Sequence, residues 1–310
     1  MSKPTLLVTR PLPQAMLDAL GQFGEVKIVD LTAASIPEGD IIVATPLDPI
    51  KIEVLAKLPK SVRLIANIGI GVDHVDLAAA RELGIAVSNT PVVTEDTADL
   101  AMALMLATCR KLSASERYLR AGDWASGMGQ LGIRVHGKTL GIIGMGAIGQ
   151  ALARRAQGFG MEIIYSSRGR KPEAEETLNA RFCETKEQLL AEADIVSLNC
   201  DLNPNTRHII DAEALGKMKP GAVLINAGRG PLVDEAALIQ ALESGHLGGA
   251  GLDVYEFEPQ VSPALTGFDN VTLLPHIGSA TQECRADMAR RVCMNIATFI
   301  QQGTPQDCCN

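Results

Sequence analysis

The stretch KTLGIIGMGAIGQ, residues 138–150, restricts the possible fold of this chain more than any other. An apolar run from Leu140 to Ile143 leads directly into three glycines and then into a helical pattern. Gly144 lets the chain turn sharply out of the strand, Gly146 lets a diphosphate approach a backbone without a Cβ, and Gly149 lets the helix sit close to the sheet. The pattern predicts the strand–turn–helix of a dinucleotide-binding unit.

The start of the following helix supplies the second part of this predicted site. The N–H groups of its first turn, around Ala147 and Ile148, have no partner within the helix and lie at the positive end of its dipole, which favours an anion. A strand precedes the glycines, a helix follows them, and a second strand comes next, from Glu162 to Ser166. This context favours a nucleotide site over the alternative, a tight turn without a ligand.

The end of that second strand indicates which nucleotide is bound. A site for NAD places an acidic residue there, about 20 residues after the glycines, to hold the ribose hydroxyls. This chain has Ser166, Ser167, Arg168 and Arg170 instead, followed by a lysine. Hydroxyls and cations can receive a 2′-phosphate, and Arg168 is the best placed. We therefore expect NADP, with NAD as a weaker possibility; the alternative is a solvated basic loop.

Composition excludes several classes of partner. The chain has 310 residues, enough for two domains, and 46% of them are hydrophobic. The net charge is −8 and aromatic residues make up 3%, which indicates neither a nucleic-acid-binding patch nor a membrane-binding surface. No signal pattern is seen at the start, and no apolar run approaches the roughly 20 residues of a membrane span. We expect a cytoplasmic protein.

The cysteines indicate neither a disulfide framework nor a metal site. There are seven, and no two of them form a CxxC pair. Most lie in apolar surroundings, where a thiol behaves as a small hydrophobic group. We expect no metal and a reduced protein, although the neighbouring Cys308 and Cys309 could oxidise.

Strands and helices alternate along the chain, which predicts parallel sheets covered on both faces. The expected strands of the first part are residues 5–9, 26–30, 41–45, 63–67 and 85–89, and those of the later part include 194–200, 222–228, 250–255 and 271–275. We place the domain boundary at the long apolar helix after Thr94, a plausible N-cap. The segment ERYLRAGDWASGMGQLGIRVHG, residues 116–137, is expected to be loop and surface. The last helix, from Thr281, is expected to pack back on the first domain.

Three expected loops of the second domain each follow a strand and carry an ionisable residue. They contain Arg229, Glu258 and His276, and in a doubly wound sheet such loops meet at the edge that faces the nucleotide. Reduction of a 2-oxo acid needs a cation to bind the carboxylate and polarise the ketone, and a proton donor for the alkoxide. Arg229 and His276 fit these roles, and Glu258 would raise the pKa of the imidazole.

Each of these residues has a plainer explanation when taken singly. A lone arginine between glycines is usually surface, and a lone histidine after a strand usually has a structural role. Four other histidines were interpreted as unremarkable: His74, His136, His208 and His246. In the first domain, Asn67-Ile68-Gly69-Ile70-Gly71 follows a strand, and its backbone could face a small anion or simply form a turn.

Four segments together resemble the D-isomer-specific 2-hydroxyacid dehydrogenases, in their usual order: LGIIGMGAIGQALA, INAGRGPLVDEAAL, GAGLDVYEFEP and LLPHIGSAT. The resemblance implies two doubly wound domains with a cleft between them. One is a Rossmann cofactor domain, residues 97–284. The other is a discontinuous, flavodoxin-like substrate domain, residues 1–96 and 285–310. It also implies a homodimer built on the helix after Thr97.

The resemblance further implies roles for individual residues. Arg229 resembles the substrate-binding arginine, His276 the proton donor and Glu258 its carboxylate partner, and the amides of Ile70 and Gly71 resemble the substrate-carboxylate cradle. Asp253, Ala227 and Gly278 resemble positions around the nicotinamide. Two positions depart from the family pattern: Ser166 replaces the acidic residue, and Asn199-Cys200-Asp201 replaces His-Cys-Pro in the adenine pocket.

Within that family the segments look most like NADP-dependent glyoxylate/hydroxypyruvate reductases. Reductases of 2-ketogluconate and of (hydroxy)phenylpyruvate are close alternatives. A remoter alternative is a dehydrogenase-like co-repressor that binds the nucleotide without turnover, because a shared fold does not fix the function.

Overall fold

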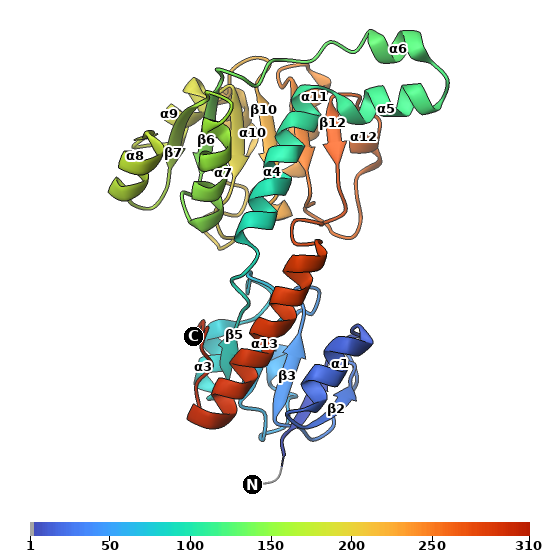
Figure 1. Cartoon of the computed structure of the whole chain (residues 1–310), viewed down its shortest axis with the longest axis vertical. Coiled ribbons are helices and arrows are strands. Elements are labelled where there is room, and N and C mark those ends of the chain that lie inside the picture. Colours follow the sequence, from blue (N-terminus) through green and yellow to red (C-terminus); the bar gives the residue numbers. More distant parts are fainter. Residues whose placement is uncertain (1–2) are drawn as a thin grey trace. The chain divides into compact units, whose positions relative to one another are not determined.

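The computed structural model describes residues 3–310 and contains two α/β units, each with a parallel sheet (Figure 1), which confirms the expected fold class. The first unit runs to Val93 and resumes over Ser279–Asn310, and the second is Thr94–Gly278. The second unit begins three residues before, and ends six residues before, the limits expected from sequence, 97 and 284. The reason is that helix α4 starts at Thr94, which is its first residue rather than its N-cap.

The first unit is built on a five-stranded sheet. Its strands are β1 (Thr5–Val8), β2 (Glu25–Ile28), β3 (Ile41–Ala44), β4 (Leu64–Asn67) and β5 (Ala86–Ser88), in the order β2-β1-β3-β4-β5 and all parallel. This is the flavodoxin-like order. Every residue of β3 and β4 is buried, as expected for a parallel sheet covered on both faces.

The two faces of this sheet use alternate residues of each strand. Leu6 and Val8 pack with helices α1 (Gln14–Gly21) and α13 (Gln282–Gln302), the latter through Val292 and Ile296. Leu7 lies on the other face, in the cluster that includes residues of α2 (Ile52–Leu55) and α3 (Leu77–Glu82). Helix α13 thus completes one face of a sheet whose strands come from the opposite end of the sequence.

The last residues cover the edge strand of the same sheet. Ser88 and Cys308 form an antiparallel bridge, and the Cys309 N–H donates to the Val87 carbonyl at 2.7 Å. The Asn310 side chain accepts from the Val87 N–H at 2.9 Å and donates to the Ile85 carbonyl at 2.9 Å. These bonds satisfy backbone groups that an edge strand would otherwise expose.

The second unit is built on a seven-stranded sheet in the order β12-β11-β10-β9-β6-β7-β8. The strands are β6 (Thr139–Ile143), β7 (Glu162–Ser166), β8 (Ala180–Phe182), β9 (Ile195–Leu198), β10 (Val223–Asn226), β11 (Gly249–Leu252) and β12 (Val271–Leu273). All neighbours are parallel, and the order reverses between β6 and β9. That reversal is the place where open α/β sheets bind ligands, beyond the carboxyl ends of the strands.

Helices cover both faces of this sheet (Figure 1). One core cluster contains residues of α4 (Thr94–Cys109), α7 (Ala147–Gln157) and α8 (Pro172–Leu178). The other contains residues of α9 (Lys186–Glu192), α10 (Ala212–Lys217), α11 (Glu235–Glu243) and α12 (Pro263–Thr266). No helix within residues 3–310 is both long enough and apolar enough to cross a membrane.

The prediction that residues 116–137 form loop and surface was wrong in part, because this segment contains helical structure. Helix α5 (Leu112–Arg120) starts before it, and α6 (Trp124–Met128) lies within it, capped by the Asp123 side chain. Ala114 alone is buried in α5, whereas Trp124 and Met128 are 69% and 74% exposed. Helix α5 has an amphipathic periodicity that the sequence reasoning overlooked, whereas α6 has only five residues, too few for a periodic pattern to be recognised. Strand β8 was also not anticipated.

Candidate active site

The glycine turn after β6 is as tight as its sequence requires. Gly144 has φ +99°, and a Cβ there would lie 2.5 Å from the Cys200 nitrogen. A Cβ on Gly149 would lie 2.3 Å from the Gly144 carbonyl oxygen. Gly146, the N-cap of α7, is different, since a Cβ there would meet no atom within 4 Å. Gly144 and Gly149 are therefore required by close packing, whereas Gly146 faces open space. Helix α7 begins directly after Gly146, with Ala147 and Ile148.

The basic loop after β7 is only partly available to a ligand. The Arg170 guanidinium is bonded to the Glu175 carboxylate, which also accepts from the Tyr165 hydroxyl at 2.6 Å. The bonds from Arg170 and then Tyr165 lower the pKa of Glu175 to about 2. Arg168, in contrast, is 93% exposed, with a 3.9 Å approach to Asp201. Arg168 is therefore an accessible cation of this loop, as is the exposed Lys171, and it follows Ser166 and Ser167 in the chain.

Cys200 lies next to the glycine turn, after β9. Burial is the main cause that raises the pKa of its thiol to about 11. A thiol with so high a pKa remains protonated at neutral pH and is a poor nucleophile. Cys200 therefore contributes a small side chain beside the glycine turn rather than a reactive group.

The loop after β10 is shaped by a buried asparagine. The Asn226 side chain donates to the Arg229 carbonyl at 2.9 Å and accepts from the Gly228 N–H at 3.1 Å. These bonds curl residues 226–229, including Ala227, into a compact turn. The Arg229 guanidinium donates to the Gly228 carbonyl at 2.9 Å. The turn therefore fixes both the backbone of Arg229 and one contact of its side chain.

Asp253 joins the loop after β11 to the loop after β12. Its carboxylate accepts from the N–H groups of Ile277 at 2.7 Å and Gly278 at 2.8 Å, and its carbonyl accepts from the His276 N–H at 2.8 Å. The residue is 1% exposed, and burial raises its pKa despite these bonds. Asp253 thereby holds His276 in position, in a left-handed backbone conformation with φ +55°.

His276 and Glu258 form a bonded pair. The His276 Nδ1 lies 2.8 Å from a Glu258 oxygen, and the other Glu258 oxygen accepts from the Tyr255 N–H at 2.9 Å. Burial alone would raise the pKa of Glu258, but the bonds from His276 and Tyr255, together with the charge of Arg229, lower it. Because Nδ1 is engaged, Nε2 is the nitrogen that remains to give a proton to a ligand.

The lowered pKa of Glu258 predicts a pH dependence of stability. A carboxylate whose pKa is lower in the folded state than its ordinary value of 4.5 stabilises the fold above that value, and this contribution is lost as the pH falls through the folded pKa. The free energy of unfolding should therefore fall less steeply below pH 4.5 in Glu258→Gln than in the unmodified protein. Urea unfolding between pH 7 and pH 3 measures this. The exposed Glu213→Gln serves as control, and equal slopes for all three proteins would contradict the prediction.

In the first unit, the loop after β4 presents its amides outward. The Asn67 side chain donates to the carbonyls of Gly69 and Gly71, and the Asn89 side chain donates to the carbonyl of Ile70 at 2.8 Å. In a planar trans peptide the N–H points opposite to the carbonyl. Holding the Gly69 and Ile70 carbonyls inward therefore directs the N–H groups of Ile70 and Gly71 the other way, where an anion could be bound.

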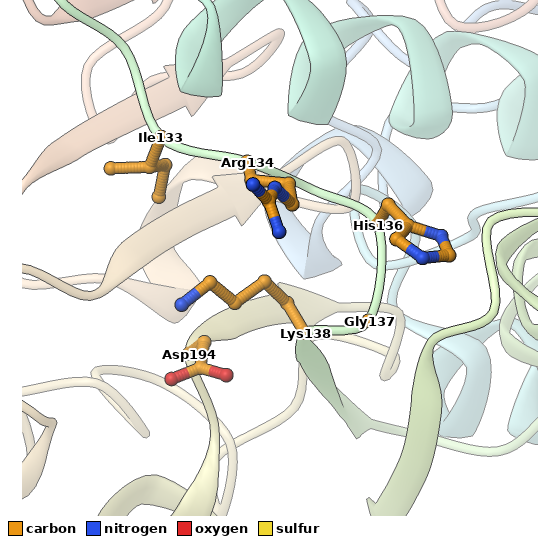
Figure 2. Close-up of a pocket in the computed structure, with 6 residues that line it drawn as sticks. All are labelled: Ile133, Arg134, His136, Gly137, Lys138 and Asp194. Atoms are coloured by element: carbon orange, nitrogen blue, oxygen red, sulfur yellow. The ribbon is translucent and has the colours of Figure 1, made fainter.

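A pocket of about 470 Å³ lies elsewhere, at the amino ends of β6 and β9 (Figure 2). It is lined by Ile133, Arg134, His136, Gly137, Lys138 and Asp194, and His136 points away from Lys138 and Asp194. Asp194 is already satisfied by the Thr139 N–H and by Lys219. Since the glycine turn, Arg229, Glu258 and His276 follow the carboxyl ends of strands, this pocket belongs to the opposite edge. Within residues 3–310 no group of three or more His, Cys, Asp or Glu side chains could hold a metal.

The structure thus joins His276 by direct bonds to both Glu258 and Asp253, and the charge of Arg229 contributes to the lowered pKa of Glu258. Sequence reasoning missed the carboxylate and asparagine that shape these loops, Glu256 and Asn226. It also set aside His208, whose Nε2 lies 2.6 Å from Glu256. Their signal was weak, because a polar side chain next to a catalytic one looks like any loop residue.

Comparisons with known proteins agree with this geometry. Residues 102–278 match the family model described as D-isomer specific 2-hydroxyacid dehydrogenase, NAD binding domain. The chain is 43% identical to the glyoxylate reductase of Thermococcus litoralis, over 99% of this chain and 97% of that protein. It is 40% identical to glyoxylate/hydroxypyruvate reductase B of Escherichia fergusonii, over 99% and 98%.

A solved structure is similar over nearly its whole length. It is the NADPH-dependent glyoxylate/hydroxypyruvate reductase of Sinorhizobium meliloti in complex with NADP and malonate. The TM-score is 0.92 at 34% identity, and the match covers 99% of this chain and 97% of that one.

Proposed function

This chain belongs to the D-isomer-specific 2-hydroxyacid dehydrogenase family, and from that premise we propose that it reduces small 2-oxo acids, glyoxylate and hydroxypyruvate, with NADPH. Hydroxypyruvate would give a D-2-hydroxy acid, and glyoxylate the achiral glycolate. The observation that carries the proposal is the 2.8 Å bond between His276 Nδ1 and Glu258. Both residues follow strands of the sheet whose strand β6 leads into the glycine turn.

The residues of the second unit fit a dinucleotide. Gly146 leaves open the space in front of α7, whose first-turn N–H groups suit a diphosphate. Ala227, Cys200, Asp253 and Gly278 lie in loops after strands of the same sheet, and Ser166 is the last residue of β7. When bound, the nicotinamide dinucleotide supplies the hydride that the carbonyl carbon receives.

The protein side chains handle the carboxylate and the proton. We propose that the Arg229 guanidinium pairs with the substrate and polarises its carbonyl oxygen, and that the amides of Ile70 and Gly71 bind the carboxylate. As negative charge develops on the oxygen, His276 gives it the Nε2 proton, and Glu258 stabilises the imidazolium before transfer and holds the ring. The sum is one hydride and one proton added across the carbonyl.

A substrate panel tests the proposal. Purified protein should oxidise NADPH in the presence of glyoxylate or hydroxypyruvate, and less rapidly with 2-ketogluconate or phenylpyruvate. Faster turnover of either of the last two would favour the alternative reductases. Nucleotide binding without turnover of any of the four would contradict the proposal and favour a co-repressor-like role.

Arg168 is the residue that we expect to distinguish NADPH from NADH. Because it is exposed and the end of β7 carries no acidic residue, it can pair with a 2′-phosphate. Replacing Arg168 by alanine should weaken NADPH binding by roughly 1–3 kcal/mol, the scale of a charge-assisted hydrogen bond, and leave NADH binding nearly unchanged. Fluorescence titration with both nucleotides measures this. Arg170→Ala is the comparison, since Arg170 already pairs with Glu175. Equal losses for NADPH and NADH would refute the role.

We also propose a homodimer, as the resemblance implies, but with its contact in residues 112–131 rather than on the helix after Thr97, because Leu104 and Met105 of that helix pack in the core of the second unit. Leu112, Leu119, Trp124, Met128 and Leu131 are 52% to 84% exposed, an unusual density of large apolar side chains for a free surface. Analytical ultracentrifugation should show a dimer that Trp124→Glu weakens. A monomer in the unmodified protein would contradict this proposal.

A further inference from the structure

A second carboxylate lies close to the proposed catalytic pair and is more deeply buried than Glu258. The Glu256 side chain is 7% exposed, and one of its oxygens accepts from Arg207 at 2.9 Å and lies 2.6 Å from His208 Nε2. The other oxygen accepts from the Glu235 N–H at 3.2 Å. In return the Glu256 N–H donates to the Glu235 carboxylate at 3.2 Å. Both carboxylate oxygens of Glu256 and its backbone N–H therefore have hydrogen-bond partners inside the protein.

The two side-chain partners of Glu256, Arg207 and His208, come from a segment that also runs beside the arginine loop. The His208 N–H donates to the Pro231 carbonyl at 2.8 Å, and the Ile210 N–H donates to the Leu232 carbonyl at 3.0 Å. The Asp234 N–H donates back to the Ile210 carbonyl at 3.0 Å. Residues 208–210 are thus fastened to residues 231–234, which directly follow the loop of Arg229.

The arginine loop also touches the glutamate loop directly. A Cβ on Gly230 would lie 1.8 Å from the Tyr255 carbonyl oxygen and 2.6 Å from the Glu256 nitrogen. Gly230 is therefore required by the close approach of the two backbones. Any displacement of residues 255–256 would move Gly230, and Arg229 precedes it in the chain.

We propose that Glu256, held by Arg207 and His208, is a positioning residue that fixes the Arg229 loop against the loop that carries Glu258. This inference rests on the proposed function, because it concerns the alignment of the same cation and proton donor. A buried carboxylate paired with an arginine and bonded to a histidine is costly to disturb, since loss of its charge leaves the Arg207 guanidinium without its partner. Misplacement of catalytic groups by about 1 Å can cost on the order of 100-fold in rate.

The test uses Glu256→Gln in the full-length protein. Glutamine keeps the size of the side chain but replaces one oxygen with an amino group that cannot accept a bond. With 2-oxo acid and NADPH, kcat should fall roughly 10- to 100-fold and KM for the 2-oxo acid should rise, whereas the Kd for NADPH stays the same. Glu213→Gln is the matched control, because Glu213 forms an exposed pair with Lys217 in the same unit. A stability effect alone would not produce this separation of kcat and KM from Kd.

Two further variants make the test independent of how well Glu256→Gln folds. His208→Gln keeps a side-chain donor, so it should retain clearly more of the kcat than His208→Leu does. The ring resonances of His276 in a ¹⁵N-histidine NMR spectrum should shift in His208→Leu and not in Glu213→Gln, whether or not any substrate turns over. If the unmodified protein is inactive but the His276 resonances shift in His208→Leu, the proposed function is refuted and the positioning role still stands. Active unmodified protein, with kcat and His276 resonances unaffected in the folded Glu256 and His208 variants, would overturn the positioning role.

Discussion

Replacing His276 by glutamine is expected to lower kcat for reduction of glyoxylate roughly 10²- to 10⁴-fold, the usual contribution of a positioned general acid. Glutamine is close to histidine in size but cannot give up a proton at neutral pH. The ring of His276 is held by Glu258 at Nδ1, which leaves Nε2 as the nitrogen that gives the proton. The measurement is NADPH oxidation under saturating 2-oxo acid, with binding of NADPH measured separately.

His136→Gln is the matched control for this experiment. His136 lies in the same unit, in the pocket at the amino ends of β6 and β9 (Figure 2), and its Nδ1 lies 2.9 Å from the Phe159 carbonyl oxygen. We expect unchanged kcat in His136→Gln. Wild-type kcat in a folded His276→Gln protein would exclude His276 as the proton donor.

The second large effect is expected from Arg229→Gln. Loss of the guanidinium removes both the partner of the substrate carboxylate and the donor that polarises the carbonyl, and removal of one such donor costs roughly 10²- to 10³-fold in rate. Both kcat and KM for the 2-oxo acid should therefore deteriorate. Arg229→Lys should recover only part of the loss, since lysine keeps the charge without the planar, bidentate group.

Arg154→Gln controls for the loss of a positive charge. Arg154 pairs with Glu95 on the surface of the same unit, and such pairs contribute little. Wild-type KM in Arg229→Gln, or an equal loss in Arg154→Gln, would show that Arg229 does not bind the substrate.

Much of the second unit could be predicted because its signals are local. The glycine turn works through backbone approach, and the order of glycines, strand and helix in the sequence already fixes that geometry. The pairing of His276 with Glu258 was likewise anticipated, because parallel strands bring their following loops to one edge. The site roles that depend on a bound nucleotide or substrate remain predictions.

Other features could not be read from the sequence because they depend on tertiary contacts. The pairing of Arg170 with Glu175 arises only when α8 folds back on the end of β7. His208 looked unremarkable because its partner, Glu256, is 48 residues away in sequence. Helix α6 has only five residues, so periodicity gave no signal for it, whereas the amphipathic pattern of α5 was present in the sequence and was overlooked.

The return of α13 to the first unit has a consequence for synthesis on the ribosome. The first 93 residues emerge with the Leu6 and Val8 face of their sheet still lacking Val292 and Ile296. At 5–20 residues per second, roughly 10–40 s pass before α13 is made, a period in which the continuous second unit can already fold. The nascent chain therefore carries an apolar face that α1 covers only in part for most of its elongation, and chaperone binding during translation should concentrate on that face rather than on the nucleotide-binding unit.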